Sequence, residues 1–509
     1  MMKNKFYILI VGVLLGEMTI SCDSFFDMEL KNSIKEDDFY KNSNDLNAAA
    51  FGIYATIAPE VHKFLLWGSA RADMVTNGSE SDAFVTEFVN NTVSSQNPYT
   101  NYAFLYQAIA RCNQQLESLY KVQPSVNASR KYLDCFYGES YFMRAFCYFW
   151  LVRTYKDFPL LEEDISETVK YVSSSGDTIR AHTLSLSNED IRSLALQPAS
   201  EQKVWGLIQS DLNRALQLLR SDPQWLIEGY GGWPELSKIR GSLKSAGALA
   251  AEVAVWMGKY AEAVAYASSV TGAESLGNAD AWASQFTGTI TNGSAYTLFS
   301  FAYAYTYGRE TNRLQEFTSN VEQDGGRYLL KPVMSVYNEI FNESEDCRRI
   351  SAVRIDRKPL IWKYIGQDAK GESMRKPYES SASFHSVKTA DVFLWQAIAA
   401  NRFGNYDMAF SILNNLRVAR GLTGYTKEEI KMTTPVLEAL LFKEKAREDA
   451  YEGKRWYDLL LMETRLGYTG IIGTTISKKY TDAAQAAEVK NRLSAPASWY
   501  LPIDPDKWK

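Results

Sequence analysis

The sequence predicts a mostly α-helical protein, built as a helical-repeat scaffold that carries long irregular loops and a few short strands. Three observations support this fold class. Apolar residues recur at spacings of three and four in most hydrophobic segments, which is the period of a helix. Several of these segments follow one another in pairs. Twice the second helix of a pair starts with a Gly-x-Tyr-x-x-Ala step, at Gly258–Ala263 and at Gly404–Ala409. That step is typical of tetratricopeptide-like helix pairs, in which small residues allow close packing.

The chain begins with a segment that looks like a secretory signal. Lys3 and Lys5 precede the apolar run Phe6–Gly16, which is too short to span a bilayer but fits a signal core. Ser21 stands directly before Cys22, as at a lipoprotein processing site. We therefore expect residues 1–21 to be a lipoprotein signal peptide and Cys22 to be the lipidated residue.

Helical patterns then follow in order along the chain, separated by irregular stretches. The helical patterns cover Leu105–Leu119, the stretch from Gly138 to just before Pro159, Val204–Leu219, Lys244–Trp256, Tyr260–Ala267, Ala390–Ala400 and Tyr406–Ala419. The irregular stretches cover about 61–104, 160–200, 220–243, 270–388 and 464–509, with short strands expected at Tyr296–Phe301 and Leu360–Ile365. Long structured loops on a rigid scaffold are where binding usually resides.

Composition argues against several classes of function. The formal net charge of −5 over 509 residues argues against nucleic acid as a partner. With three histidines and no Cys-x-x-Cys motif, no zinc site or other metal site is expected. Four thiols are expected to be reduced core residues: Cys112, Cys135, Cys147 and Cys347. The sequence contains no phosphate-binding loop, GxSxG or HExxH motif, so we expect no cofactor and no catalytic centre. A structural calcium ion is left open.

The most informative segment is Gly138–Pro159, GESYFMRAFCYFWLVRTYKDFP. Phe142, Phe146 and Phe149 share one helical stripe, and large apolar groups cover the other faces as well. A helix that is apolar almost all round belongs inside a large protein. Buried charges need partners there, and the segment carries three: Glu139, Arg144 and Arg153.

The order GE-x-x-F-x-RAF-x-YF-x-LV-x-x-Y-x-D-x-P in this segment resembles the signature helix of the SusD/RagB family. Further matches cover nearly the whole mature chain, among them Asp38–Tyr40, Ala48–Tyr54, Gly68–Asp73, Tyr106–Ile109, Lys244–Ala246, Leu413–Leu422 and Tyr500–Ile503. The chain departs from the family pattern at Lys156, Gln396 and Asp504, where glycine, glutamate and proline are usual.

The resemblance implies a surface-exposed lipoprotein, anchored in the outer membrane by its lipid, that binds a poly- or oligosaccharide. It implies that the protein is not an enzyme and acts as the lid of a SusC-like TonB-dependent transporter. It also implies one SusD-like domain over residues 22–509. Its N-terminal helical part is 22–220 with loop 67–102, its mid-chain part with a loop-rich insertion is 221–388, and its C-terminal helical part is 389–509.

A charged segment near the C-terminus invites an enzymatic interpretation, because paired carboxylates perform acid/base chemistry on glycosides. Six of its charged residues carry that interpretation: Glu444, Arg447, Glu448, Glu452, Arg455 and Asp458. Spacings of three and four place them along one helix face, where Glu/Arg pairs add small increments of helix stability. Glycosidase carboxylates instead face each other across a sugar. We therefore expect a structural role for this segment.

Relatives build their glycan site near the N-terminal loop motif and in the mid-chain insertion, which correspond here to residues 67–102 and 282–317. A sugar ring stacks its C–H face on an aromatic plane and presents hydroxyls to polar side chains. The candidate binding residues are Arg71, Phe84, Phe88, Asn90, Tyr99, Trp282, Tyr303 and Tyr305. Phe88 and Tyr305 are the leading candidates for stacking, with Arg71 and Asn90 for hydroxyls. The alternating Tyr303, Tyr305 and Tyr307 share one face, which either binds ligand or packs on the helices.

Three other functions remain open at this point. An oligopeptide-binding lid of a peptide-importing transporter would recognise backbone groups of its ligand. A surface glycoside hydrolase would release reducing ends and lose that activity when one of two facing carboxylates is neutralised. A structural adaptor would bind a protein partner tightly and no small ligand.

Overall fold

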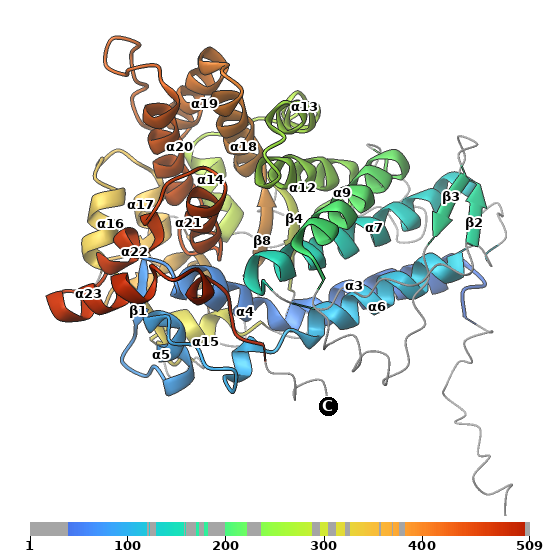
Figure 1. Ribbon diagram of the computed structural model, residues 1–509, viewed down its shortest axis with the longest axis horizontal. Helices are drawn as coiled ribbons and strands as arrows, with labels where there is room; N and C mark the ends of the chain where they lie inside the picture. Colours follow the sequence, from blue (N-terminus) through green and yellow to red (C-terminus); the bar gives the residue numbers. More distant parts are fainter. Residues whose placement is uncertain are drawn as a thin grey trace, which may run out of the picture. The chain divides into compact units, whose positions relative to one another are not determined.

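The computed structural model describes residues 39–119, 122, 129–156, 158, 169–172, 178–181, 199–220, 236–287, 296–303, 312–320, 326–355, 358–368, 370–375 and 382–503. The chain forms two compact units, 1–41 and 42–509, and the described part of the first is 39–41. Cys22 and Tyr305 lie outside the described residues. Helices dominate the second unit, which confirms the prediction of a mostly α-helical fold with a few short strands (Figure 1). No helix within the described ranges is long and apolar enough to cross a membrane.

Four long helices form the N-terminal part: α3 (Ser43–Ile57), α6 (Ala103–Ser118), α7 (Arg130–Thr154) and α9 (Glu201–Leu218). They pack in the order α3, α6, α7, α9, so α7 lies between α6 and α9 (Figure 1). The signature helix is α7. It ends at Thr154 rather than just before Pro159, because Tyr155 is extended and the Thr154 carbonyl accepts a hydrogen bond from the Leu501 N–H at 2.8 Å.

The predicted helix pairs are present. They are α12 (Leu243–Trp256) with α13 (Tyr260–Thr271) and α18 (Thr389–Arg402) with α19 (Tyr406–Ala419), followed by α20 (Thr434–Glu448). Gly258 and Gly404 separate the helices of each pair with φ of +71° and +88°, a conformation that favours glycine. The alanines of both Gly-x-Tyr-x-x-Ala steps are fully buried. Helix α13 also packs on α18, which joins the two pairs.

The stretches predicted to be irregular contain short helices as well as loops. They hold η3 (Ala58–Glu60), α4 (Val61–Leu65), η4 (Leu66–Ala70), α5 (Ala83–Asn90), η5 (Pro98–Thr100), α11 (Leu236–Ile239), α14 (Ala279–Thr287), α15 (Leu314–Thr318), α16 (Met334–Ile340), α17 (Arg348–Ala352), η9 (Trp362–Tyr364), α22 (Ile471–Ser477), α23 (Ala483–Arg492) and η11 (Pro496–Trp499). Between α20 and α22, the charged segment continues into α21 (Arg455–Thr464).

The strands form two-stranded antiparallel sheets. The pairs are β1 (Val75–Asn77) with β5 (Leu330–Pro332), β2 (Val169–Val172) with β3 (Thr178–Ala181), β4 (Thr297–Phe301) with β8 (Phe384–Lys388), and β6 (Val353–Arg354) with β7 (Leu360–Ile361). The strand predicted at Tyr296–Phe301 is β4. The one predicted at Leu360–Ile365 ends after two residues, because the chain turns into η9.

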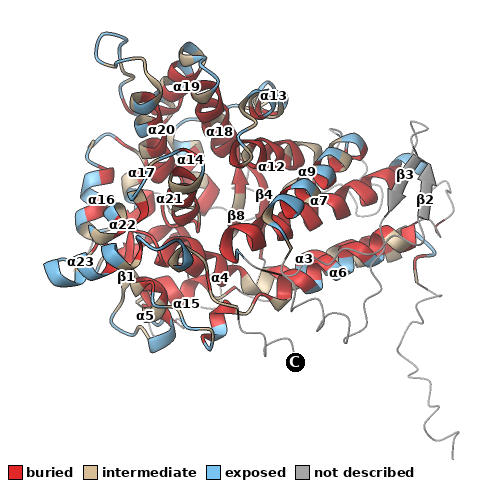
Figure 2. Ribbon diagram, viewed as in Figure 1, coloured by how far each residue is buried: buried red, intermediate tan, exposed pale blue. Residues whose placement is uncertain are grey.

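Helix α7 is buried along almost its whole length, as predicted (Figure 2). Its three charges find partners on other helices and on the segment before α12. Arg144 makes a bidentate ion pair with Asp211 of α9 at 2.8 and 2.7 Å, Glu139 pairs with Arg240, and Arg153 reaches Glu252 at 3.0 Å. The four thiols at Cys112, Cys135, Cys147 and Cys347 are free, as expected.

Removing the acidic partner of α7 should destabilise the protein strongly. Asp211→Ala leaves the Arg144 guanidinium buried without its carboxylate, so the free energy of unfolding should fall by about 3 to 5 kcal/mol. The matched control is Asp407→Ala, because Asp407 pairs with Lys427 at 2.6 Å through side chains that are 80% and 60% exposed. That change should cost less than about 1 kcal/mol. Denaturant unfolding measures both, and equal losses would contradict the role of the buried pair.

Candidate functional site

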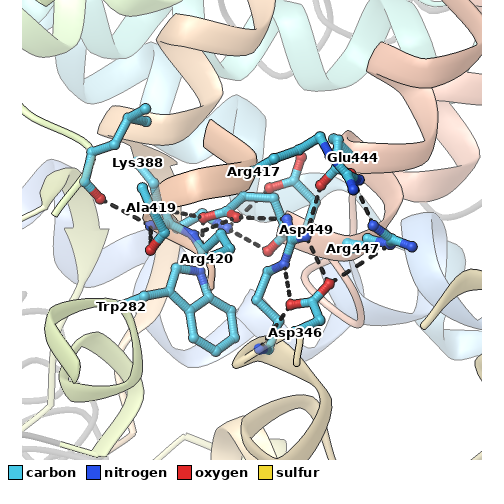
Figure 3. A network of polar contacts seen from close by, with 12 residues as sticks. Trp282, Asp346, Lys388, Arg417, Ala419, Arg420, Glu444, Arg447 and Asp449 are labelled. Carbon is cyan, nitrogen blue, oxygen red and sulfur yellow. Dashed lines mark hydrogen bonds and ion pairs between the residues drawn. The ribbon is translucent and has the colours of Figure 1, made fainter. Parts of the chain in front are cut away.

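The charged segment forms a buried network of ion pairs, seen from close by in Figure 3. Helix α20 ends at Glu448, and Glu452 lies in the turn that follows, so the acidic residues do not share one helix face. Glu444, Glu448 and Glu452 are all buried. The expectation of small increments along one helix face is therefore wrong, because these carboxylates are held inside the protein by cations from other elements.

Arginines surround Glu444 and Glu448 of α20. Glu444 accepts from Arg348 at 2.7 Å and from Arg417 at 2.9 Å. Glu448 accepts from both ends of the Arg420 guanidinium, at 3.0 and 2.9 Å, and from the Trp282 indole N–H at 2.7 Å. Burial acts to raise the pKa of Glu448, but the charges and hydrogen bonds of Arg420 and Arg348 lower that pKa to about 2. Glu448 is therefore ionised at neutral pH.

Lysines surround the acidic residues after α20. Lys388, at the end of β8, pairs with Glu452 and with Asp449 at 3.0 Å, and Lys363 of η9 also pairs with Glu452. Burial lowers the pKa of Lys363 to about 8. A cavity of about 30 Å³ lies beside this group, lined in part by Glu452 and Asp458. That volume holds a water molecule but not a sugar ring. These contacts support the structural role expected of the charged segment.

The structure places the candidates of loop 67–102 in different surroundings. Phe88 is 0% exposed and lies on the inner face of α5, so it offers no ring to a ligand in this structure. Phe84, one turn earlier, is 42% exposed. Asn90 is half-buried at the end of α5, where its carbonyl accepts from Arg492 at 2.8 Å. Phe84 and Asn90 keep accessible surface, whereas the expectation of an exposed Phe88 is wrong.

The candidates of loop 282–317 are buried where they are described. Trp282 is fully buried and donates its indole N–H to Glu448. Tyr303 is buried, and its hydroxyl donates to the Ala58 carbonyl. It lines a cleft of about 510 Å³ with mostly apolar walls, including Phe51 and Phe301. Neither residue is an exposed stacking platform.

The structure brings the two predicted loops together at the surface between α5 and α15. Arg313, from the second loop, lies with its guanidinium 5.8 Å from the ring centroid of Tyr99, from the first, and 5.7 Å from that of Phe317. Its Nη2 donates to the Tyr99 hydroxyl at 3.5 Å. We call this region the α5–α15 face. Its accessible residues are Asp82, Phe84, Arg313, Glu316 and Arg327. The candidate Tyr99 is buried, as are His62 and Phe317, and these three side chains pack against Arg313 rather than offer a ring to a ligand.

A row of charges runs along the α5–α15 face. Glu316 bridges two arginines, accepting from Arg313 Nε at 2.8 Å and from Arg327 Nη1 at 3.1 Å. Arg327 also lies 3.7 Å from Asp82. The Arg313 and Arg327 side chains are 42% and 47% exposed, so both present N–H groups to solvent. Sequence reasoning named Tyr99 for this face but not Glu316 or Arg327, since their pairing joins separate stretches of the chain.

Electrostatics fix the protonation of the α5–α15 face. Burial and the neighbouring Arg313 lower the pKa of His62 to about 4, so this imidazole is neutral at pH 7. Burial acts to raise the pKa of Glu316, but the hydrogen bond and charge of Arg313 bring it below its ordinary value. The face therefore presents guanidinium donors and ionised carboxylates, both of which hydrogen-bond hydroxyl groups.

Arg71, the remaining candidate, lies apart from this row. It is buried, stacks on the Trp456 ring at 3.7 Å, and lines a second cleft, of about 590 Å³, against the C-terminal segment. We call this the Arg71 cleft. Its other walls include Asn91, Lys156, Tyr500 and Ile503.

The two phenylalanines of α5 should respond differently to truncation. Phe88→Ala should lower the free energy of unfolding by about 3 to 5 kcal/mol, because it leaves a cavity in a packed region. Phe84→Ala, the matched control on the exposed face of the same helix, should change it by no more than about 0.5 kcal/mol. Thermal and denaturant unfolding of the two variants measure this difference. A stable Phe88→Ala variant would contradict the buried position.

The Glu448 network should make the protein sensitive to acid. The folded-state pKa of Glu448 lies below its ordinary value, so its contribution to stability is complete above about pH 4.5 and is lost as pH falls towards 2. The loss should be on the order of 3 kcal/mol over that range. Glu448→Gln should be less stable at pH 7 and should show a shallower decline in acid. The free energy of unfolding at pH 7, 5, 4 and 3 tests this, with the exposed Glu428→Gln as control. Parallel curves for Glu448→Gln and the unmodified protein would rule it out.

Comparisons with known proteins give a consistent result. The curated relatives include SusD-like protein P38 of Formosa agariphila, 22% identical over 504 residues that cover 90% of this chain and 91% of the relative. SusD-like protein P2 of the same organism is 24% identical over 473 residues, covering 83% and 84%.

Solved structures share the fold. A SusD superfamily protein from Bacteroides vulgatus superposes with a TM-score of 0.71 at 20% identity, covering 92% of this chain and 97% of that one. A laminarin-binding SusD-like protein gives a TM-score of 0.65 at 20% identity and the same coverage. A family model described as "Starch-binding associating with outer membrane" matches residues 28–227, and one described as "SusD family" matches residues 284–507. These matches confirm the resemblance of the signature helix, and the chain belongs to the SusD/RagB family.

Proposed function

We propose that this protein captures poly- or oligosaccharides on the cell surface and binds them at the α5–α15 face. The observation that carries the proposal is the meeting of Tyr99, from the first predicted loop, with Arg313 and Phe317, from the second. Membership of the SusD/RagB family supports carbohydrate as the ligand class, as does the likeness to a laminarin-binding protein.

The chemistry of the α5–α15 face suits a sugar. Arg313 and Arg327 are rigid, planar donors, and Glu316 holds both in fixed directions. Hydroxyl groups of a sugar accept from such guanidinium groups and donate to the carboxylates of Glu316 and Asp82. The exposed ring of Phe84 supplies an apolar surface for a C–H face.

We infer binding without cleavage. A glycoside hydrolase needs one carboxylic acid whose pKa is raised so that it protonates the leaving group. On the α5–α15 face Glu316 lies between two arginines, and its pKa is lowered. An ionised carboxylate of this kind accepts hydrogen bonds but does not act as a general acid.

We further propose that a lipid on Cys22 anchors the protein in the outer membrane, where the protein is exposed at the cell surface. We also propose that the protein acts as the lid of a SusC-like TonB-dependent transporter. The support for this is the lipoprotein processing pattern before Cys22 together with membership of the family. The lid would close over the transporter barrel after glycan has bound, so that the transporter imports the ligand.

Calorimetric titration of the chain without residues 1–22 tests the ligand class. The panel includes laminarin, other plant, host and microbial glycans, and a mixed oligopeptide pool. Micromolar to millimolar binding to one glycan class, with no release of reducing ends, is the expected outcome. Heat from peptides alone would move the cargo to peptides, and new reducing ends would overturn the non-catalytic role.

Arg313→Gln should weaken binding of that glycan about tenfold or more, since it removes charged donors to hydroxyl groups. The thermal midpoint should change little, because the side chain is 42% exposed. The matched control is Arg465→Gln, a 35% exposed arginine paired with Glu201 of α9, away from this face. If both variants bind equally well, the site lies elsewhere.

A further inference from the structure

The Arg71 cleft is lined by cations without a balancing acid. Of the described residues that line it, two are basic, Arg71 and Lys156, and none is acidic. The acid nearest to Arg71 in the sequence, Asp73, is engaged elsewhere, accepting from Arg455 at 3.0 and 3.1 Å. The described lining of the cleft is therefore positively charged, within a protein whose formal net charge is −5.

Arg71 itself lacks a charged partner among the described residues. Its Nε donates to Asn91 Oδ1 at 3.2 Å, and its Nη2 donates to the carbonyls of Ser498 and Trp499 at 3.0 Å. Its Nη1 makes no hydrogen bond although the side chain is only 2% exposed. A buried guanidinium normally has a carboxylate or a comparable oxyanion as partner, and no described residue supplies one to Arg71.

The electrostatic environment agrees with this geometry. Burial lowers the pKa of Arg71 to about 9, and only tyrosines act in the opposite direction. Lys479, which donates to the carbonyls of Ala70 and Ala72, has its pKa lowered to about 7 by burial and further by Arg71. A bound anion would offset both effects.

Part of the cleft wall is apolar, and the cleft is large enough for more than an ion. Tyr500, Pro502 and Ile503 line the side contributed by the C-terminal segment. A volume of about 590 Å³ lies in the usual range for small-ligand pockets. Lys156 is exposed, two residues after the end of α7. Its φ is not positive, so this lysine adds a charge without backbone strain.

We propose that the Arg71 cleft binds the carboxylate or sulfate group of an acidic saccharide unit, whose ring lies against the apolar wall. The exposed ammonium of Lys156 contacts the oxyanion, the buried guanidinium of Arg71 adds its positive charge from the wall of the cleft, and Tyr500 contacts the sugar ring. This inference rests on the proposed glycan-binding function and adds to it a preference for anionic sugars at a site separate from the α5–α15 face.

A pair of matched ligands tests the proposal on the chain without residues 1–22. Tetragalacturonate and its full methyl ester share one sugar backbone, and the ester lacks the charges and carries methyl groups in their place. A sulfated oligosaccharide with its desulfated form distinguishes sulfate from carboxylate. At about 50 mM salt, at least one acidic form should bind ten or more times tighter than its neutral counterpart, and added salt should weaken it. Equal affinities within both pairs would overturn the proposal. If inorganic sulfate binds as tightly as the acidic oligosaccharides, the proposed contact between the cleft and a sugar ring is overturned.

Lys156→Gln carries the test on the protein side, because Arg71→Gln also breaks the contacts that hold the C-terminal segment. Lys156→Gln should weaken the acidic ligand about three- to tenfold, and Lys490→Gln, an exposed lysine on α23 outside the cleft, should not. If the two variants behave alike, the cleft is not the site. If neutral glycan binding is lost in Arg313→Gln but kept in Lys156→Gln, the two sites are separate. In that case, unchanged binding of the acidic ligand by Lys156→Gln would overturn the site in the Arg71 cleft but not the proposed function.

Discussion

The arrangement of the C-terminal half depends on the pairing of carboxylates that are buried at the end of α20. An ionised carboxylate inside a protein is costly unless cations and hydrogen-bond donors surround it. Glu444, Glu448 and Glu452 receive those partners from Trp282 on α14, Arg348 on α17, Lys363 on η9, Lys388 on β8, Arg417 on α19 and Arg420 directly after α19. All of these elements must therefore pack around the end of α20.

This requirement explains how a loop-rich insertion is held in one position. The mid-chain segments contain few long helices, so packing of regular elements alone would position them weakly. Cations from η9, α17 and β8 instead reach inwards to the C-terminal helices, while Arg313 and Glu316, at the start of α15, keep accessible surface. The inner contacts fix the scaffold, and the outer residues are then available for a ligand.

The parts of the fold that depend on local patterns could be predicted from the sequence. Helix α7, the helix pairs after Gly258 and Gly404, and the burial of Arg144 all follow from periodicity within one segment. The expected exposure of Phe88 is wrong, because Val85, Phe88 and Val89 recur at helical spacing and Asp82 caps the helix. Those signals predict α5 and its inner face. Trp282 offers no comparable signal, because its partner Glu448 is 166 residues away in the sequence.

One short segment contributes to both proposed sites, so they are not mechanically independent. Asp82 and Phe84 lie on the α5–α15 face, while Asn91, the left-handed residue that ends α5, lines the Arg71 cleft. Asn91 also accepts from Arg71 Nε and donates to the Arg71 carbonyl at 2.9 Å, which holds the end of the helix to the guanidinium. A saccharide with neutral and acidic units that spans both sites would bind more tightly than one that occupies a single site. Binding at one site raises the effective concentration of the saccharide at the other. Because α5 is held rigidly, the distance between the two sites is constant. The protein would therefore select saccharides by the spacing of their acidic units.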